Sequence, residues 1–212
     1  MELWHVIYRG VDGRDIFKDD QDRARFVHDL YEFNDTAPAG VYVGHTMSKA
    51  RETIVEVHGW KLMPNHVHLL LSESRDDGFS LFLKKMRGYA RYYNERHSRR
   101  GILFDKMKKV HIEREAHFLY ILHYIHLNGL DDLPGAERWR ERDKGAISDV
   151  GAALAHLGQD KWSSFRDYCG IANFPSILTT RLFEDRPREY ERDLEDFLQN
   201  RTDPGLAAYD LE

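Results

Sequence analysis

Two histidines at alternate positions are the residues of this chain best suited to hold a metal ion. His66 and His68 lie in residues 64–71, where a Pro-Asn turn signal precedes an apolar run typical of a buried strand. Side chains two residues apart on a strand share a face, so both imidazoles project together while Val67 faces the opposite way, into a core. Neutral imidazole is a common metal ligand, and this spacing predicts half of a metal site. The alternative interpretation is two ordinary polar residues on a solvated strand face, and the spacing alone does not decide between them.

A second group of side chains shares one face of a helix predicted over residues 113–128. Tyr120, Tyr124 and Asn128 follow one another at intervals of four residues, which places them on adjacent helical turns. A tyrosine hydroxyl is a potential nucleophile, and an amide oxygen can bind a metal ion. Alternatively, both tyrosines belong to the core and Asn128 caps the helix before Gly129.

These groups need a scaffold, and the pattern of apolar residues predicts one. Strands are predicted over residues 3–10, 40–44 and 53–62, and the histidine strand is a fourth. Helices are predicted over residues 19–34, 78–101, 113–128 and 187–198, with a helical turn at 162–165. Residues 102–112 are predicted to form a strand or a loop. The 53–62 strand returns as the histidine strand, most simply as an antiparallel hairpin. This order favours an α+β sandwich with an antiparallel sheet, in which the histidine strand is central and the 113–128 helix lies across the same face.

Length and cysteine content set the class of protein. The chain of 212 residues is long enough for one large domain, or for a domain with an extension. Its single cysteine, Cys169, excludes an internal disulfide framework and a cysteine-rich zinc site, and it suits a reducing cytosol. We expect a cytoplasmic protein, because the first residues do not form a signal peptide and no apolar run reaches membrane-spanning length.

The net charge of −5 hides a strong asymmetry along the chain. Residues 84–114 carry eleven Lys and Arg against three acidic residues, whereas residues 181–212 carry ten acidic residues against five arginines. A basic segment close to the histidine strand indicates an anionic partner bound in one place. The alternative is that both segments are solvated helix faces.

Several runs of residues resemble one protein family. They are Met63-Pro64-Asn65-His66-Val67-His68-Leu69-Leu70, Tyr89-Ala90-Arg91-Tyr92-Tyr93-Asn94 and Tyr124-Ile125-His126-Leu127-Asn128, with weaker matches at residues 9–17 and 162–165. Together they resemble the single-tyrosine HUH transposases, and most of all the branch of REP-associated tyrosine transposases. The resemblance covers roughly residues 3–170, and motifs in this order are more specific than His-x-His alone. Two stretches depart from the family pattern: Gly129-Leu130-Asp131-Asp132 stands where members usually continue Asn-Pro-Val, and the aromatic-and-basic segment is reduced to residues 104–109.

The resemblance implies a fold and a set of site residues. It implies a ferredoxin-like or RRM-like sheet with packed helices, a catalytic domain over residues 1–129, and a helical C-terminal extension over residues 130–212 whose Trp162-Ser163-Ser164 segment packs back. It also implies that His66 and His68 bind a divalent metal, Mg²⁺ or Mn²⁺, that Tyr124 is the nucleophile, and that Asn128 is a third ligand.

The activity implied is nicking and rejoining of single-stranded or hairpin DNA through a 5′-phosphotyrosine intermediate. The residues expected to contact DNA are Lys84, Lys85, Arg87, Arg91, Lys106, Lys108 and Lys109. We expect a monomer or homodimer with no membrane partner. Two alternatives stay open: a nucleic-acid-binding module that has lost cleavage, and a metal-dependent phosphohydrolase of small nucleotides. A histidine-triad hydrolase is disfavoured because Leu70 stands where a third alternating histidine would be.

Overall fold

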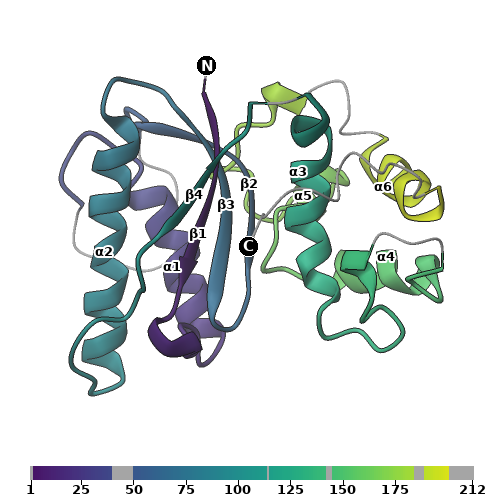
Figure 1. The fold of residues 1–212 in the computed structure, drawn as a ribbon. Coiled ribbons are helices and arrows are strands. Elements are labelled where there is room, and N and C mark those ends of the chain that lie inside the picture. The colour runs from purple at the N-terminus through teal and green to yellow at the C-terminus, as the bar shows by residue number, and fades with distance from the viewer. Residues whose placement is uncertain (1, 40–49, 114, 142–144, 184–188, 201–212) are drawn as a thin grey trace.

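A four-stranded antiparallel sheet separates two layers of helices in the computed structural model (Figure 1). The structure describes residues 2–39, 50–113, 115–141, 145–183 and 189–200. The strands lie in the order β2 (Val55–Leu62), β3 (His66–Glu73), β1 (Leu3–Arg9) and β4 (Lys108–His111), and each pairs antiparallel with its neighbours. The predicted α+β class is therefore confirmed.

The histidine strand, β3, is an interior strand, as the hairpin pattern predicted. It pairs on one side with β2, where Lys61 stands opposite His68, and on the other side with β1, where Ile7 stands opposite His68. Both faces of an interior strand are covered by the rest of the fold, which explains why seven of its eight residues are buried. The strand predicted over residues 40–44 lies outside the described residues.

One helical layer is formed by α1 (Asp20–Glu32) and α2 (Gly78–Arg96). α1 begins where predicted, because the Asp19 side chain accepts hydrogen bonds from the backbone N–H groups of Gln21 and Asp22. α2 ends five residues before the predicted end at Gly101, since Ser98 adopts a left-handed backbone with φ of 50°. Val67 packs into the core on this side of the sheet, as predicted.

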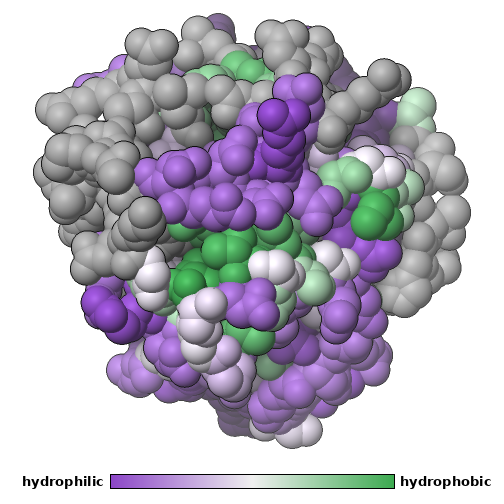
Figure 2. Space-filling model, turned by 90° about the vertical axis from the view of Figure 1, so that its right-hand side faces the viewer, coloured by the Kyte–Doolittle hydropathy of each residue, from purple (hydrophilic) through white to green (hydrophobic). Residues whose placement is uncertain are grey.

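The other layer contains α3 (Glu115–Leu127), α4 (Val150–Gln159), α5 (Phe165–Tyr168) and α6 (Tyr190–Gln199). Leu70 of β3 packs here with Ile121 and Ile125 of α3, in the same cluster as Leu157 and Phe165 of the later helices. Residues after 130 thus share one hydrophobic core with α3. Figure 2 shows this side from outside, where a central patch of hydrophobic residues is surrounded largely by hydrophilic ones. No helix in the described part of the chain is long and apolar enough to cross a membrane.

Ser164 joins the second layer to the sheet. Its backbone N–H donates to the Trp60 carbonyl at 3.0 Å, and its Oγ accepts from the Trp60 N–H at 2.9 Å. The same Oγ lies 2.8 Å from Nε2 of His126 on α3, whose Nδ1 lies 2.6 Å from the Tyr190 hydroxyl. This buried network fixes α3, α5 and α6 against β2 and thereby positions the C-terminal part of α3.

Gly59 lets α3 approach the sheet closely. β2 changes register between Val57 and Gly59, and a Cβ added at Gly59 would lie 2.7 Å from Cδ1 of Leu122. A larger residue there would push against the Leu122 side chain of α3, because carbon atoms cannot approach so closely.

Candidate functional site

Three histidines on two neighbouring strands form a continuous chain on the α3 side of the sheet. Nε2 of His66 lies 3.0 Å from Nε2 of His68, and Nδ1 of His68 lies 2.9 Å from Nε2 of His5 on β1. The rings of His5 and His68 stack with centroids 5.1 Å apart. The predicted pairing of His66 and His68 on one face therefore exists, and it is extended by His5.

Hydrogen-bond partners fix which nitrogen of each ring carries the proton. The Asn65 amide donates through Nδ2 to the Gly13 carbonyl at 3.2 Å, so its Oδ1 accepts from Nδ1–H of His66 at 2.6 Å. A neutral His66 then presents a lone pair at Nε2, toward which Nε2–H of His68 donates. Nδ1 of His68 in turn accepts from Nε2–H of His5. This direction also leaves the buried Nδ1 of His5, which has no partner in the described chain, as a bare acceptor rather than an unbonded N–H.

The environment of two of these rings, His5 and His68, favours the neutral form. Burial lowers the pKa of His5 to about 3, and the nearby charge of Lys108 acts in the same direction. Burial also holds the pKa of His68 well below its usual range, with further contributions from His5, His66, Arg140 and Arg9. Neutral imidazole is the form that binds metal ions and accepts protons.

α3 brings Tyr124 to this chain of histidines. The Tyr124 ring meets the rings of His5 and His68 edge-on, with centroids 5.9 and 5.8 Å away, and only 4% of the residue is exposed. Tyr120 lies one turn back and contacts Tyr124 and Phe197 instead. The preference for Tyr124 over Tyr120 stays a prediction, and the geometry gives it a basis because Tyr124 contacts two of the three histidines.

Asn128 is buried at the end of α3, where its amide has two partners. Nδ2 donates to the Tyr124 carbonyl at 2.7 Å, which caps the helix, and Oδ1 accepts from Nη2 of Arg140 at 2.9 Å. The oxygen predicted to bind a metal is thus bonded to a guanidinium in this structure. Its role as a ligand remains a prediction.

The histidine pair fits two positions around one metal ion. Two nitrogens about 2.1 Å from an ion and at a right angle to each other are about 3.0 Å apart, which is the spacing between the two Nε2 atoms here. The second nitrogen of each ring is also hydrogen-bonded, Nδ1 of His66 to the Asn65 oxygen and Nδ1 of His68 to Nε2 of His5, as is usual around metal ligands. In the described ranges, no group of three or more His, Cys, Asp or Glu side chains is arranged to hold a metal. Other ligands would have to come from Asn128, water or substrate.

Cationic side chains surround the histidines. Across the sheet, the row that contains His68 begins with Lys61 on β2 and ends with Lys108 on β4, and Arg9 stands opposite His66. Lys61 is paired with Asp160. Arg9 and Lys108 make this face attractive to an anion, because cross-strand partners project on the same side of a sheet.

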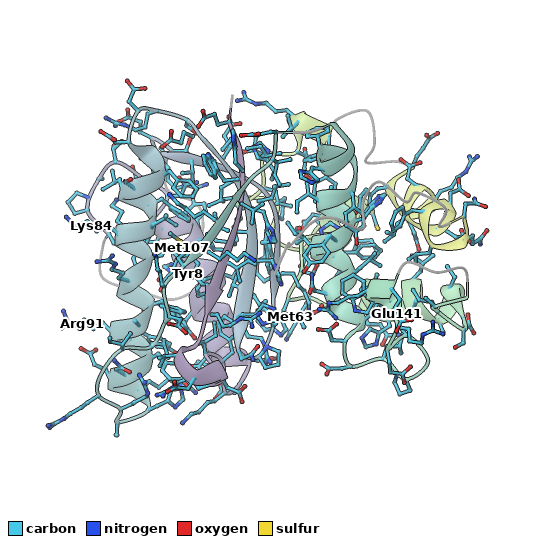
Figure 3. The ribbon with its side chains drawn as sticks, in the orientation of Figure 1. Tyr8, Met63, Lys84, Arg91, Met107 and Glu141 are labelled. Carbon is cyan, nitrogen blue, oxygen red and sulfur yellow. The ribbon has the colours of Figure 1, made fainter. Side chains whose placement is uncertain are left out.

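The predicted DNA-contacting residues fall on different surfaces. Lys108 belongs to the face of the histidines, whereas Lys109 lies over the rings of Trp4 and Phe79 on the opposite face. Figure 3 shows Lys84 and Arg91 pointing outward from α2, away from the sheet and from α3. Lys85 donates to the Asp35 and Ala37 carbonyls. The α2 residues therefore do not line the surface that carries Tyr124.

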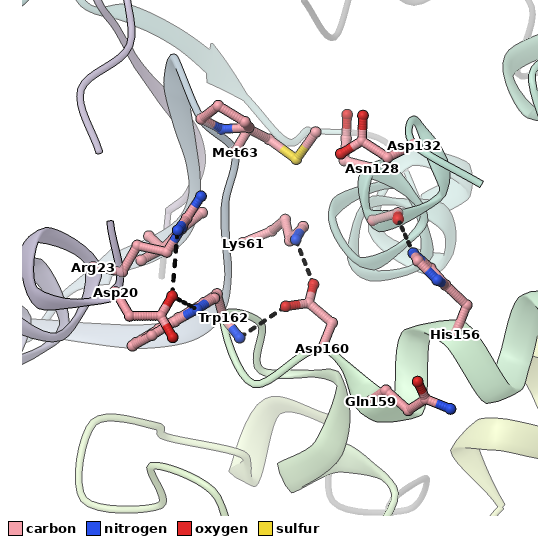
Figure 4. Close-up of a pocket in the computed structure, with 13 residues that line it drawn as sticks. Asp20, Arg23, Lys61, Met63, Asn128, Asp132, His156, Gln159, Asp160 and Trp162 are labelled. Atoms are coloured by element: carbon pink, nitrogen blue, oxygen red, sulfur yellow. Dashed lines mark hydrogen bonds and ion pairs between the residues drawn. The ribbon is translucent and has the colours of Figure 1, made fainter. Parts of the chain in front are cut away.

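A pocket of about 360 Å³ adjoins the site, between β2 and the end of α3 (Figure 4). Its lining includes Met63 and Pro64 from the turn before His66, together with Asn128. The Lys61–Asp160 pair and the hydrogen bond from His156 to the Gly129 carbonyl also line it. The pocket thus has mostly polar and charged groups beside the end of α3.

Sequence reasoning missed His5, Arg140 and the role of Asn65. His5 has a weak signal, since it is a histidine within an alternating apolar strand, but its partner lies 63 residues away. Arg140 follows α3 in a stretch without periodicity, and no pattern there predicts a site residue.

No protein-family model and no curated protein matches the chain. Among solved structures it is similar to a REP-associated tyrosine transposase bound to a REP hairpin, with a TM-score of 0.49 and 12% sequence identity over 85% of this chain and 87% of that chain. A likeness at this level carries no argument about function, which rests instead on the geometry of the site.

Proposed function

We propose that this protein cleaves and rejoins single-stranded or hairpin DNA through a covalent bond to Tyr124. The observation that carries the proposal is the approach of the Tyr124 ring, from α3, to the His5–His68 ring pair beside His66. A nucleophile and a pair of neutral imidazoles from distant parts of the chain thus meet on a cationic sheet face. This combination suits transfer of a phosphodiester.

The proposed step exchanges one phosphorus–oxygen bond for another. The Tyr124 oxygen bonds to phosphorus, the bond from phosphorus to the 3′ oxygen breaks, and the 5′ phosphate stays on the tyrosine. The phenol gives up one proton and the departing 3′ oxygen takes up one proton, which leaves a 3′ hydroxyl. That hydroxyl can attack the phosphotyrosine in reverse, so joining needs no external energy source.

Each side chain has a defined task in this scheme. His66 and His68 would hold a divalent ion, Mg²⁺ or Mn²⁺, which when bound supplies charge that stabilises the phosphate oxygens. His5 and Asn65 orient those two rings through their hydrogen bonds. Arg9 and Lys108 attract the DNA backbone to this face.

An assay for a covalent protein–DNA adduct tests the proposal. Wild-type protein with end-labelled single-stranded hairpins and Mn²⁺ should give an adduct on denaturing electrophoresis. Tyr124→Phe should give none while it retains DNA binding, and Tyr120→Phe, the matched change one turn away, should still give it. An adduct that survives in Tyr124→Phe and disappears in Tyr120→Phe would assign the nucleophile to Tyr120.

A nucleic-acid-binding module without cleavage is the second candidate. It is favoured by the hydrogen bond that holds the Asn128 oxygen on Arg140, and by the burial of Tyr124. Its signature is DNA binding that is indifferent to metal and to Tyr124, with no adduct from the wild-type protein on any hairpin tested.

A further inference from the structure

The short turn after α3 places an arginine beside the candidate site. We propose that the Arg140 guanidinium binds the phosphodiester that Tyr124 attacks, so that the 3-10 turn Trp139–Glu141 forms part of the DNA-binding site. This inference rests on the proposed function, because it identifies a further contact to the same substrate.

Hydrogen bonds link Arg140 directly to the helical turn that carries the nucleophile. Arg140 belongs to the 3-10 turn Trp139–Glu141, and its Nη2 donates to Oδ1 of Asn128 at 2.9 Å. Asn128 in turn donates to the carbonyl of Tyr124 at 2.7 Å. Two hydrogen bonds therefore connect the guanidinium with the backbone carbonyl of Tyr124.

Ring contacts connect Arg140 with Tyr124 by a second path. The guanidinium carbon lies 4.2 Å from the centroid of the Trp139 ring, and that ring lies 5.8 Å from the ring of Tyr124. Tyr124 is itself 5.8 Å from the ring of His68. Arg140 is thus connected with Tyr124 both by hydrogen bonds through Asn128 and by ring contacts through Trp139. Arg140 and Trp139 therefore lie at the end of α3 that is next to the histidines.

Asp131 holds the arginine in place while leaving it accessible. Its Oδ1 accepts from Arg140 and, at 2.7 Å, from Nε1 of Trp139, and its Oδ2 accepts from Arg140 at 3.0 Å. The Arg140 side chain nevertheless remains 37% exposed. A planar guanidinium that is already oriented loses little side-chain entropy when it binds a ligand that arrives from solvent.

A phosphodiester is the ligand that this arrangement suits. Guanidinium groups bind phosphate through charge-assisted N–H···O bonds, which are stronger than bonds between neutral groups. Arg9 and Lys108 add positive charge on the sheet face that carries His5 and His68. If Arg140 bonded a phosphate oxygen in place of the Asn128 oxygen, the Asn128 oxygen would lose this donor and could serve as a ligand.

Coupling between Arg140 and one phosphate of the DNA tests this inference without requiring cleavage. Fluorescence polarisation would measure the affinity of the Tyr124→Phe protein for a series of hairpins, each with a single neutral methylphosphonate in place of one phosphate. We expect one position at which neutralisation weakens binding about tenfold. Arg140→Ala should weaken binding of unmodified DNA by a similar factor, and should cause no further loss on DNA neutralised at that position.

Two further variants separate binding from folding. Arg138→Ala removes an exposed arginine next to the same turn, where it pairs with Glu141. The affinity lost through this substitution should add to the affinity lost through each methylphosphonate, at every position of the DNA. Arg140→Gln keeps an amide donor for Asp131, so it should fold like the parent and bind like Arg140→Ala. If the affinity lost by both Arg140 variants adds to the methylphosphonate effect at all positions, the inference about Arg140 is overturned, although the protein still binds DNA. Absence of any DNA binding by the parent would overturn the proposed function together with it.

Discussion

Proton positions matter as much as distances in the histidine chain. The bonds from His5 to His68, from His68 to His66 and from His66 to Asn65 run in one direction. For both Nε2 atoms to hold an ion, His68 would carry its proton on Nδ1, and His5 would carry its own proton on Nδ1 so that its Nε2 accepts the hydrogen bond from His68. Each ring keeps one proton in this rearrangement, so the net charge inside the protein does not change.

Replacement of His66 by Ala removes one of the two nitrogens that converge at 3.0 Å. We expect calorimetric titration with Mn²⁺ to show at least about a tenfold loss of affinity, and adduct formation to stop, while DNA affinity changes little. His111→Ala is the matched control, since that histidine is also on a strand but stacks on Trp4 at the opposite face. Full cleavage by His66→Ala, or by the wild type in excess chelator, would remove the metal from the mechanism.

At the scale of elements, the separation between α3 and the sheet determines whether the site exists. α3 lies close to β2 at Gly59, where an added Cβ would meet Leu122 at 2.7 Å and would lie 3.8 Å from Oγ of Ser164. The Ser164 hydrogen bonds to Trp60 and His126 join the same helix to β2 at this place. A tight contact and buried hydrogen bonds thus hold α3 against β2 together.

Gly59→Ala should therefore reduce both stability and activity. We expect a loss of about 1–3 kcal/mol in the free energy of unfolding, because the added methyl group overpacks the contact with Leu122, and a larger fall in adduct formation than in DNA affinity. Gly158→Ala in α4 is the control: a Cβ there meets nothing within 4 Å, and it should leave stability unchanged or raise it by about 0.4–1 kcal/mol. Equal behaviour of the two variants would show that the contact at Gly59 does not position α3.

Substitutions on the outer face of α2 and on the face of the histidines are expected to change the salt dependence of DNA affinity differently. Lys108 stands beside the site, whereas Lys84 and Arg87 are exposed on a helix in the other layer. We expect Lys108→Ala to lower the slope of log affinity against log salt by about 1, as for one lost phosphate contact. Joint replacement of Lys84 and Arg87 by Ala tests the prediction that the basic residues of α2 contact DNA. A lower slope would show that DNA also binds along α2. An unchanged slope would show that these charges only face solvent.

At the scale of the whole molecule, buried neutral histidines make stability depend on pH. Burial lowers the pKa of His58 below its reference value of 6.5, and the ring bonds to Ser72 and to the Thr179 carbonyl. Below pH 6.5 the unfolded chain therefore binds a proton that the folded chain does not, so stability is lost as the pH falls and is unaffected above that value. His5, His68 and His126 are shifted in the same direction.

We expect the free energy of unfolding, measured in urea at pH 7.5, 6.5 and 5.5, to fall mainly over the second interval. Each such histidine contributes at most about 1.4 kcal/mol per pH unit. His58→Gln should flatten the slope relative to the wild type, whereas the same change at His111, which is partly exposed, should not. A slope that His58→Gln leaves intact would show that His58 is not neutral in the folded protein.

Local patterns predicted much of this molecule, and long-range contacts explain what they missed. Alternation along β3 predicted that His68 and Val67 face opposite sides, because a strand imposes that period whatever surrounds it. The predicted position of the 113–128 helix across the histidine face is confirmed, but nothing in the pattern indicated that α2 covers the opposite face. It also missed Arg140, whose place depends on hydrogen bonds to Asn128 and Asp131 rather than on any periodicity.

The two edges of the sheet differ, and this bears on self-association. Along β2, Leu178 bridges to Val57, and the Thr179 N–H donates to the Val57 carbonyl, so the chain itself occupies that edge. Among the described residues, the opposite edge is β4, which is four residues long and contains Lys108 and Lys109. Two copies that paired these strands would bring lysines together, and charged, short edge strands disfavour such pairing. The lysines next to the candidate DNA surface thus also keep one sheet from joining another.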